Sequence, residues 1–220
     1  PIGVPDSWVA EAVEQCAQTT GRPPCRQIEI ADVSACQPIR PGDSHKGLFG
    51  KALLFGGAAG MPGAIVLAAE AAARSGVGLL TLAVPAAIGP AVLAARPECL
   101  LTLLPDFPAD QGSVQLTAEK TEALVSQLIA SQPAGAIGPG CGRADWLARA
   151  LPILIRKADR LVIDADALNL IAADPDSFFP LLRERVHANG LQPAILTPHH
   201  GEFRRLAPDI GMDDRQGAAR

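Results

Sequence analysis

Two glycine-rich stretches have the residue types that bind anions through the polypeptide backbone. The first, FGGAAGMPGA at residues 55–64, follows the apolar run KALL, and the second is GPGCG at residues 138–142. Because glycine has no Cβ, a ligand can approach the N–H groups of such loops closely, and a helix after the first loop would add its positive end. A tight turn without a ligand would use the same residues, so both interpretations stay open. The glycine spacing differs from the dinucleotide fingerprint GxGxxG.

A third stretch, VIDADALN at residues 162–169, places carboxylates at the end of an apolar run. A carboxylate at a strand end can bind a hydroxyl group, a cation or a protonated base. We expect Asp166 to cap a helix that starts at Ala167, which leaves Asp164 for chemistry. Cys141, in the second glycine-rich stretch, is expected to be a small buried side chain rather than a nucleophile.

The fourth stretch, TPHHGE at residues 197–202, contains two adjacent histidines. His199 could form a hydrogen bond to a substrate or transfer a proton near neutral pH. In an extended chain His199 and His200 would point to opposite sides, which disfavours a shared metal ion, and His200 is expected to be solvated. We therefore predict no metal site.

The elements that must position these stretches alternate along the chain from His45 onward. Strands are expected at Ala52–Phe55, Leu79–Val84, Leu100–Leu104, Gly135–Ile137, Leu161–Ile163 and Ala194–Leu196. Helices are expected at Gly63–Ser75, Ala86–Ala94, Ala118–Ser131, Asp145–Arg156 and Ser177–His187. Nearly all-apolar strands separated by helices are typical of an α/β fold, with a mostly parallel central sheet and helices on both faces. Since such sheets bind ligands at the carboxyl ends of their strands, we expect the four stretches to form one site.

Residues 1–44 differ from the rest, with six prolines and little sustained periodicity. We interpret them as a mostly extended lead-in or linker segment, with a short helix at Ser7–Gln18, and residues 45–220 as a separate domain.

Composition excludes several classes of function. The net charge is −4 and no basic run exceeds two arginines, so neither nucleic acid nor an anionic membrane is the expected partner. Five cysteines at long spacings favour reduced thiols in a cytoplasmic protein. The first residues lack the pattern of a signal peptide, and no apolar stretch is long enough to span a membrane. The sequence has no tyrosine, so any mechanism in which tyrosine is the general acid is excluded.

Five motifs occur together in an order that resembles one known family. They are HKGLFGKALLFGGAAGMPGAIVLAAEAAARSGVG from His45, RPE at 96–98, GPGCG, VIDADALNL and LTPHHGEF. In this order they closely resemble the NAD(P)H-hydrate dehydratases, the carbohydrate-kinase-like half of the NAD(P)HX repair system, over residues 45–206. The resemblance implies a ribokinase-like fold.

The resemblance also implies an activity. Members are lyases that use ADP, or ATP in eukaryotes, to phosphorylate the hydroxyl group of hydrated NADH or NADPH, and loss of phosphate then restores the cofactor. The partners would be the hydrate and the nucleotide, and Mg²⁺ would accompany the nucleotide. The protein would assemble as a homo-oligomer. By motif match, the residues at or near the hydrate would be Ala64, Gly138, Gly140, Gly142, Asp164, Asn169 and His199.

This sequence departs from the family pattern at several points. Family members usually have proline at the position of His200 and a bulky aliphatic residue at that of Cys141. Beyond Arg220 the resemblance would place a Lys-Gly nucleotide motif, further strands and a GTGD-like loop with the catalytic base. We therefore expect the base beyond Arg220, an exposed apolar sheet edge near residues 194–196, and weak or no activity from these 220 residues alone. Residues 1–6 resemble the end of an epimerase domain.

Other functions remain open at this stage. A ribokinase-like small-molecule kinase would share the glycine-rich loops but not the combination of HKG, GMPGA and TPH. A non-catalytic dinucleotide-binding remnant would retain cofactor affinity and lose ADP affinity. A classical NAD-dependent reductase is disfavoured by the irregular glycine spacing.

Overall fold

The computed structural model describes residues 7, 11, 14, 15, 28–37, 39–104, 117–132 and 134–210. The chain divides into two units, Pro1–Ser44 and His45–Arg220. In the first unit the described residues include helix α2, Ile30–Ala35, where Glu29 N donates to Asp32 Oδ2 at 2.9 Å. The helix predicted at Ser7–Gln18 lies mostly outside the described residues. No helix among the described residues is both long and apolar enough to cross a membrane.

The second unit is built around a six-stranded sheet in which every neighbouring pair of strands is parallel. The strands are β1 Lys51–Phe55, β2 Leu79–Pro85, β3 Leu100–Leu104, β4 Ala134–Ile137, β5 Arg160–Ile163 and β6 Ile195–Leu196. Their order is β3-β2-β1-β4-β5-β6. All six predicted strands are confirmed, with bounds that differ by at most one residue at either end.

Helices connect the strands in the way that a parallel sheet requires. They are η1 Lys46–Phe49, α3 Pro62–Arg74, η2 Ala86–Ile88, α4 Gly89–Ala95, α5 Ala118–Ser131, α6 Asp145–Lys157, α7 Ala165–Ala173, α8 Pro175–His187 and α9 His200–Leu206. The helix predicted at Ala86–Ala94 is split, since Pro90 enters α4 at its first turn and a 3₁₀ turn precedes it. Helices α7 and α9 each follow a short strand and begin within the third and fourth motif stretches.

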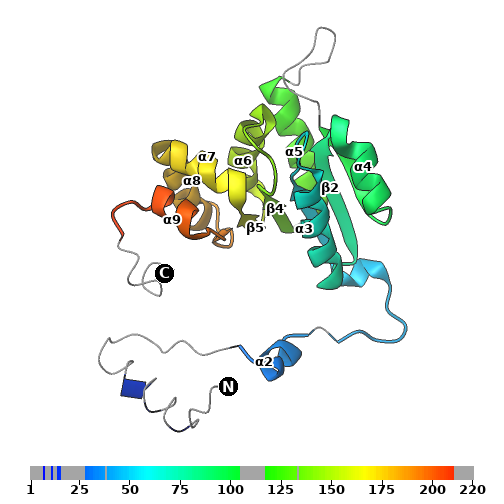
Figure 1. Cartoon of the computed structure of the whole chain (residues 1–220). Coiled ribbons are helices and arrows are strands. Elements are labelled where there is room, and N and C mark those ends of the chain that lie inside the picture. The colour runs from blue at the N-terminus through cyan, green and yellow to red at the C-terminus, as the bar shows by residue number, and fades with distance from the viewer. Residues whose placement is uncertain are drawn as a thin grey trace. The chain divides into compact units, whose positions relative to one another are not determined.

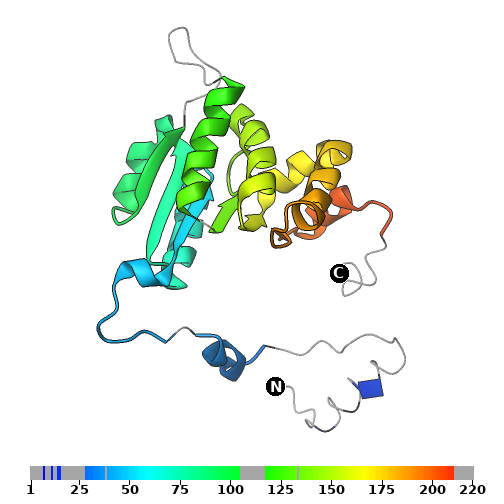
Figure 2. The same ribbon diagram turned by 180° about the vertical axis from the view of Figure 1, so that it is seen from behind.

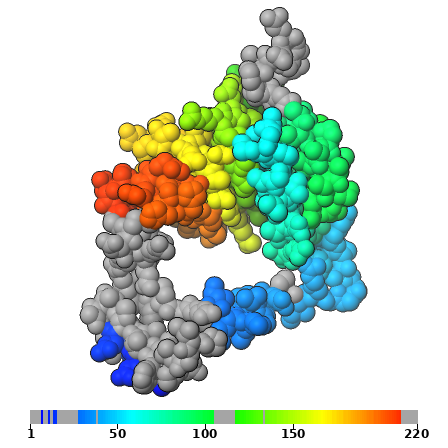
Figure 3. Space-filling model, viewed as in Figure 1, coloured from blue at the N-terminus to red at the C-terminus, as the bar shows by residue number. Residues whose placement is uncertain are grey.

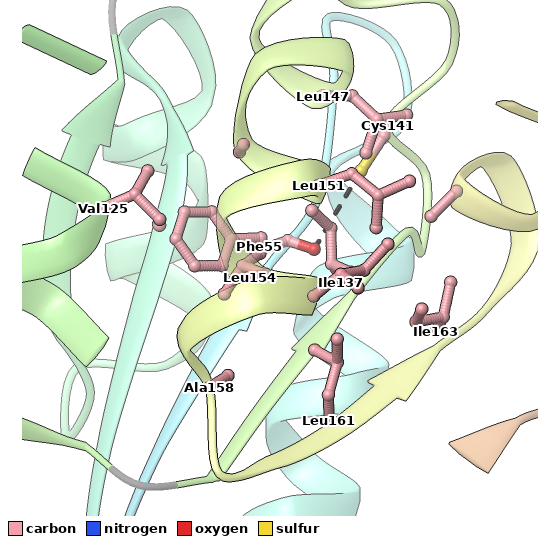
Figure 4. Packing of buried hydrophobic residues seen from close by; sticks show 14 of the residues in the cluster. Phe55, Val125, Ile137, Cys141, Leu147, Leu151, Leu154, Ala158, Leu161 and Ile163 are labelled. Carbon is pink, nitrogen blue, oxygen red and sulfur yellow. Dashed lines mark hydrogen bonds between the residues drawn. The ribbon is translucent and has the colours of Figure 1, made fainter. Parts of the chain in front are cut away.

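Two hydrophobic clusters cover the two faces of the sheet, as alternating side chains require. Leu54 packs on one face with Ile65 and Ala69 of α3 and Val92 of α4. Leu53 and Phe55 face the other cluster, which α5, α6, α7 and α8 complete with residues that include Val125, Leu151, Leu168 and Phe178. Figures 1 and 2 show α3 and α4 on one side of the sheet and α5 and α6 on the other. Figure 4 shows the second cluster around Phe55, Ile137 and Leu154.

Strand β6 ends the sheet, and its side chains are accessible to solvent. Ile195 is 61% exposed and Leu196 is 36% exposed. The apolar edge predicted near residues 194–196 is therefore confirmed among the described residues. Because β6 has only two residues, its position depends on β5 and on the segments before and after it.

Candidate functional site

The four motif stretches follow four strand ends that lie in register across the sheet. Phe55 of β1 is paired with Ile137 of β4, Ile137 with Ile163 of β5, and Ile163 with Leu196 of β6. Three interstrand spacings of about 4.8 Å place the outer two ends roughly 15 Å apart. The sequence-predicted residues are thus brought to one edge of the sheet, within the length of a dinucleotide.

The chain changes direction across the sheet between β1 and β4. The loop after β1 leads into α3 on one face, and the loop after β4 leads into α6 on the opposite face. This is the topological switch point at which open parallel sheets bind ligands. The two loops touch here, since Gly57 N donates to Pro139 O at 2.9 Å.

Gly140 packs directly against the start of α3. Its φ is +66°, and a Cβ built on it would lie 2.7 Å from Cβ of Ala64 and 3.0 Å from the carbonyl oxygen of Met61. No side chain larger than hydrogen fits at this position without a shift of α3. Two of the predicted site residues, Ala64 and Gly140, are therefore in contact. Helix α3 has no side-chain cap at Met61, so the N–H groups of its first turn are not bonded by a capping side chain.

Gly138 makes a similar close contact with the end of β5. Its φ is +130°, and a Cβ there would lie 1.7 Å from the carbonyl oxygen of Asp164. Asp164 N in turn donates to Ile137 O at 3.0 Å. Backbone contact between these two strand ends thus brings Asp164 beside the GPGCG loop.

The expectation that Asp166 caps a helix starting at Ala167 is wrong. Helix α7 starts at Ala165, and Asp164 occupies the N-cap position without a side-chain capping bond. Asp166 lies in the first turn, where its Oδ2 accepts a hydrogen bond of 2.7 Å from Gly142 N. This hydrogen bond joins Asp166 to the second glycine-rich loop, GPGCG. The Asp164 carboxylate has no hydrogen bond or ion pair among the residues that the structure describes.

Ala165, the first residue of α7, has an unusual backbone conformation. Its φ is +48°, and it is the only non-glycine residue with positive φ among the described residues. A side chain in this region costs about 1 kcal/mol relative to glycine. The turn between Asp164 and Asp166 is therefore strained, which is common at functional sites.

This strain gives a first prediction, for Ala165→Gly. The substitution is expected to raise the free energy of unfolding by about 1 kcal/mol, because glycine adopts positive φ without steric cost. Chemical denaturation of the variant and the unaltered chain measures the difference. Ala172→Gly, in the same helix, is the control and should instead lose stability by about 1 kcal/mol. A loss of equal size at both positions would contradict the strain at Ala165.

His199 caps helix α9 with its own ring. Nδ1 accepts hydrogen bonds from Gly201 N at 2.9 Å and Glu202 N at 3.4 Å, so the proton of the neutral ring is on Nε2. Nε2 lies 3.3 Å from Oε1 of Glu202, whose Oε2 accepts from His199 N at 2.9 Å. Nδ1 is therefore engaged by the backbone of α9, and Nε2 lies beside the Glu202 carboxylate. The His199 side chain is 67% exposed, so a ligand beside it can reach the part of the ring that does not cap α9.

Glu202 belongs to the TPHHGE stretch but is not among the predicted site residues, although its spacing from His199 indicates a capping role. It is 5% exposed, and the pattern of a capping residue followed three positions later by glutamate is a capping box. His200, the first residue of α9, is exposed, as predicted. No group of three or more metal-ligating side chains is found in the part of the chain that the structure describes.

Asn169 joins α7 to α9. Its Oδ1 accepts hydrogen bonds from Nε and Nη2 of Arg205 at 3.1 and 2.8 Å. Figure 3 shows the atoms of α9, in orange-red, beside those of α7, in yellow. Arg205 had no recognisable signal in the sequence, because its partner lies 36 residues away. The contact links the VIDADALN and TPHHGE segments.

Cys141 is buried, and the prediction that it is a small core residue is confirmed. Its Sγ lies 3.9 Å from the carbonyl oxygen of Phe55, as the dashed line in Figure 4 shows. Burial, and secondarily the charge of Asp166, raise the pKa of the Cys141 thiol far above its ordinary value. The neutral thiol is thus strongly favoured, which argues against a nucleophilic role.

A second prediction concerns thiol reactivity. Because the raised pKa keeps Cys141 protonated through neutral and mildly alkaline pH, iodoacetamide is expected to leave it unmodified in the native protein, while the exposed Cys36 reacts. Mass spectrometry of peptides from protein alkylated before and after denaturation measures this. Modification of native Cys141 at a rate comparable with Cys36 would show that the thiol is accessible.

Comparison with known proteins identifies the family. The family model described as NAD(P)H-hydrate dehydratase matches residues 52–220. A bifunctional NAD(P)H-hydrate repair enzyme of Salinibacter ruber is 39% identical over 223 residues, which cover 99% of this chain and 37% of that protein. The chain thus spans little more than a third of the length of this relative.

Solved structures agree with the family and the fold. An ADP/ATP-dependent NAD(P)H-hydrate dehydratase from Bacillus subtilis, co-crystallised with ATP and Mg²⁺, superposes with a TM-score of 0.57 and 29% identity, over 81% of this chain and 54% of that one. A ribokinase-like superfamily protein from Enterococcus faecalis gives a TM-score of 0.57 at 23% identity, over 82% of this chain and 57% of that one, and supports the ribokinase-like fold alone. The matched region contains all four stretches at the carboxyl edge of the sheet, and the chain belongs to the NAD(P)H-hydrate dehydratase family.

Proposed function

We propose that the carboxyl edge of β1, β4, β5 and β6 binds hydrated NADH or NADPH. We also propose that the protein to which these residues belong uses ADP or ATP to dehydrate the (6S)-hydrate back to the reduced cofactor. The observation that carries the proposal is the in-register row of four strand ends, each followed by one of the motif stretches. The topological switch between β1 and β4 lies within this row.

The proposed site uses backbone on one side and side chains on the other. Ala64, Gly138, Gly140 and Gly142 would form a flat surface against which the nucleotide can lie, and the first turn of α3 would offer N–H groups to an anionic group. Asp164 would supply a carboxylate that has no partner among the described residues. Asn169 and His199 would border the same edge, where Nδ1 of His199 is already engaged by the backbone of α9.

The proposed reaction has two steps. The nucleotide transfers a phosphoryl group to the hydroxyl oxygen of the hydrate, as its own P–O bond breaks and the hydroxyl proton passes to a base. The C–O bond between the ring carbon and the phosphorylated oxygen then breaks, and phosphate leaves with the bonding electrons. The adjacent ring carbon loses a proton, and the electrons of its C–H bond restore the ring double bond of the reduced cofactor. We assign the catalytic base to none of the described residues, and no step of the proposed reaction is assigned to a metal ion.

The domain assignment and location are part of the same proposal. Residues 45–220 would be the N-terminal portion of the dehydratase domain, preceded by a lead-in segment at residues 1–44, and the family match over residues 52–220 supports this division. A cytoplasmic location is proposed because five cysteines at long spacings are typical of reduced thiols. Small molecules are the proposed partners, within a homo-oligomer.

The test measures binding and turnover separately. Calorimetric titration with (6S)-NADPH hydrate is expected to show binding, with oxidised NADP⁺ as a control that should bind more weakly. Recovery of NADPH absorbance after ADP or ATP is added then reports turnover. Binding without turnover would show that these residues bind the hydrate but do not complete the reaction. Absence of binding would overturn the proposed function.

A further inference from the structure

The Asn169 carboxamide is held in one orientation by Arg205. A guanidinium group has only donors, so the group that faces it must be the oxygen Oδ1, which accepts from Nε at 3.1 Å and from Nη2 at 2.8 Å. Rotating the amide by 180° would place two sets of donors against each other. The contact therefore fixes which end of the amide points away from Arg205.

The other end of this amide is free. Nδ2 of Asn169 has no hydrogen-bond partner within the described part of the chain. It carries two N–H groups and cannot accept a hydrogen bond. Any ligand atom that Asn169 binds through Nδ2 must therefore be an acceptor.

Asn169 also lies between two segments of the candidate site. Asp166, which holds Gly142 N of the GPGCG loop, is three residues earlier in α7 and so on the same helix face. Arg205 belongs to α9, the helix that His199 caps, and its Nη1 is 3.7 Å from a Cβ built on Gly201. Asn169 thus shares a helix face with the residue that binds the GPGCG loop and contacts the helix that His199 caps.

We propose that Arg205 is a positioning residue. It turns the Asn169 carboxamide so that Nδ2 donates a hydrogen bond to an oxygen atom of the bound nucleotide, such as a phosphate, hydroxyl or carboxamide oxygen. The inference rests on the proposed function for the identity of the ligand. The orientation of the amide rests only on the contact with Arg205.

Nuclear magnetic resonance can observe the amide directly, because the chain has two asparagines, Asn169 and Asn189. Selective ¹⁵N-asparagine labelling therefore gives two side-chain NH₂ pairs, with Asn189 as an internal reference. Addition of (6S)-NADPH hydrate is expected to shift the Asn169 pair and leave the Asn189 pair in place. Arg205→Gln should shift the Asn169 pair without any ligand, and an unchanged pair in that variant would contradict the positioning role.

Binding measurements test the donor. Asn169→Asp has the same shape and keeps acceptors for Arg205, but removes the N–H donors, and is expected to weaken hydrate binding about tenfold or more without lowering the unfolding temperature. Arg205→Gln should weaken binding several-fold. Arg204→Gln is the matched control, since Arg204 is the exposed neighbour in the same helix, and should change affinity less than about twofold.

A double-substitution cycle separates positioning from direct contact. If Arg205 acts through Asn169, Arg205→Gln should have no further effect on affinity in an Asn169→Ala background. Additive losses would instead show that Arg205 binds the ligand itself, which overturns the proposal. Hydrate binding by the unaltered chain that Asn169→Asp leaves unchanged would overturn this inference alone, whereas no binding by the unaltered chain overturns the proposed function and this inference with it.

Discussion

Replacing Arg185 by methionine is expected to lower the free energy of unfolding by about 3–5 kcal/mol, because several charge-assisted hydrogen bonds are lost at once. Arg185 of α8 is fully buried. Its guanidinium group donates to four backbone carbonyl groups, those of Ile155, Ala158, Asp159 and Gln192. Methionine fills a similar volume but leaves these oxygens without a donor.

The position of these carbonyl groups makes the effect larger than that of a surface residue. Ile155 and Ala158 lie at the C-terminal end of α6, where unpaired carbonyl groups carry a partial negative charge. Gln192 precedes β6, so Arg185 ties the start of this two-residue strand to the helix before β5. Loss of the arginine should therefore loosen β6 and the TPHHGE segment first.

Chemical denaturation monitored by circular dichroism measures the effect. Arg183→Met, two residues earlier on an exposed position of the same helix, is the control and should change stability by less than about 0.5 kcal/mol. Similar small losses in both variants would show that the buried guanidinium group contributes little.

Gly138→Ala is expected to have an effect of comparable size, by a different mechanism. A Cβ there would lie 1.7 Å from the carbonyl oxygen of Asp164, and φ is +130°. Steric overlap with backbone and backbone strain together should cost about 2–5 kcal/mol. Because relief of the overlap requires β4 and β5 to separate at their carboxyl ends, hydrate binding should be lost as well.

Gly190→Ala separates the two causes. Gly190 also has positive φ, +63°, but a Cβ there would meet nothing within 4 Å. Its cost should therefore be backbone strain alone, about 1–2 kcal/mol, with hydrate affinity unchanged. Thermal unfolding and calorimetry on both variants give the comparison, and equal costs at Gly138 and Gly190 would rule out the close contact between the two strand ends.

The fold could be predicted from the sequence because its signals are local. Apolar runs such as Leu79–Val84, bounded by helical patterns, predict the strands, and their hydrophobicity on both faces predicts the covered parallel sheet. The convergence of the four motif stretches follows from one topological rule, since parallel strands end at the same edge. The registers then place those ends on adjacent strands.

The internal bonding of the site could not be predicted, because it depends on contacts between distant residues and on unusual backbone geometry. The aspartate pattern suggested a cap at Asp166, but α7 begins at Ala165, and Asp166 in its first turn accepts a hydrogen bond from Gly142 N. His199 suggested a side chain that binds substrate or transfers a proton, yet its Nδ1 caps helix α9. The contact between Asn169 and Arg205 joins helices whose packing no local pattern reveals.

Mapping of backbone amide shifts tests the central claim most directly, that the four loops form one nucleotide site at the carboxyl edge of the sheet. Uniformly ¹⁵N-labelled protein is titrated with (6S)-NADPH hydrate. The largest shifts are expected at Gly57, Ala64, Gly140, Gly142 and Asp164, with little change at Gly78, which lies at the amino edge beside η1. Shifts centred on Gly78 and η1, or no shifts at the four loops, would contradict the site.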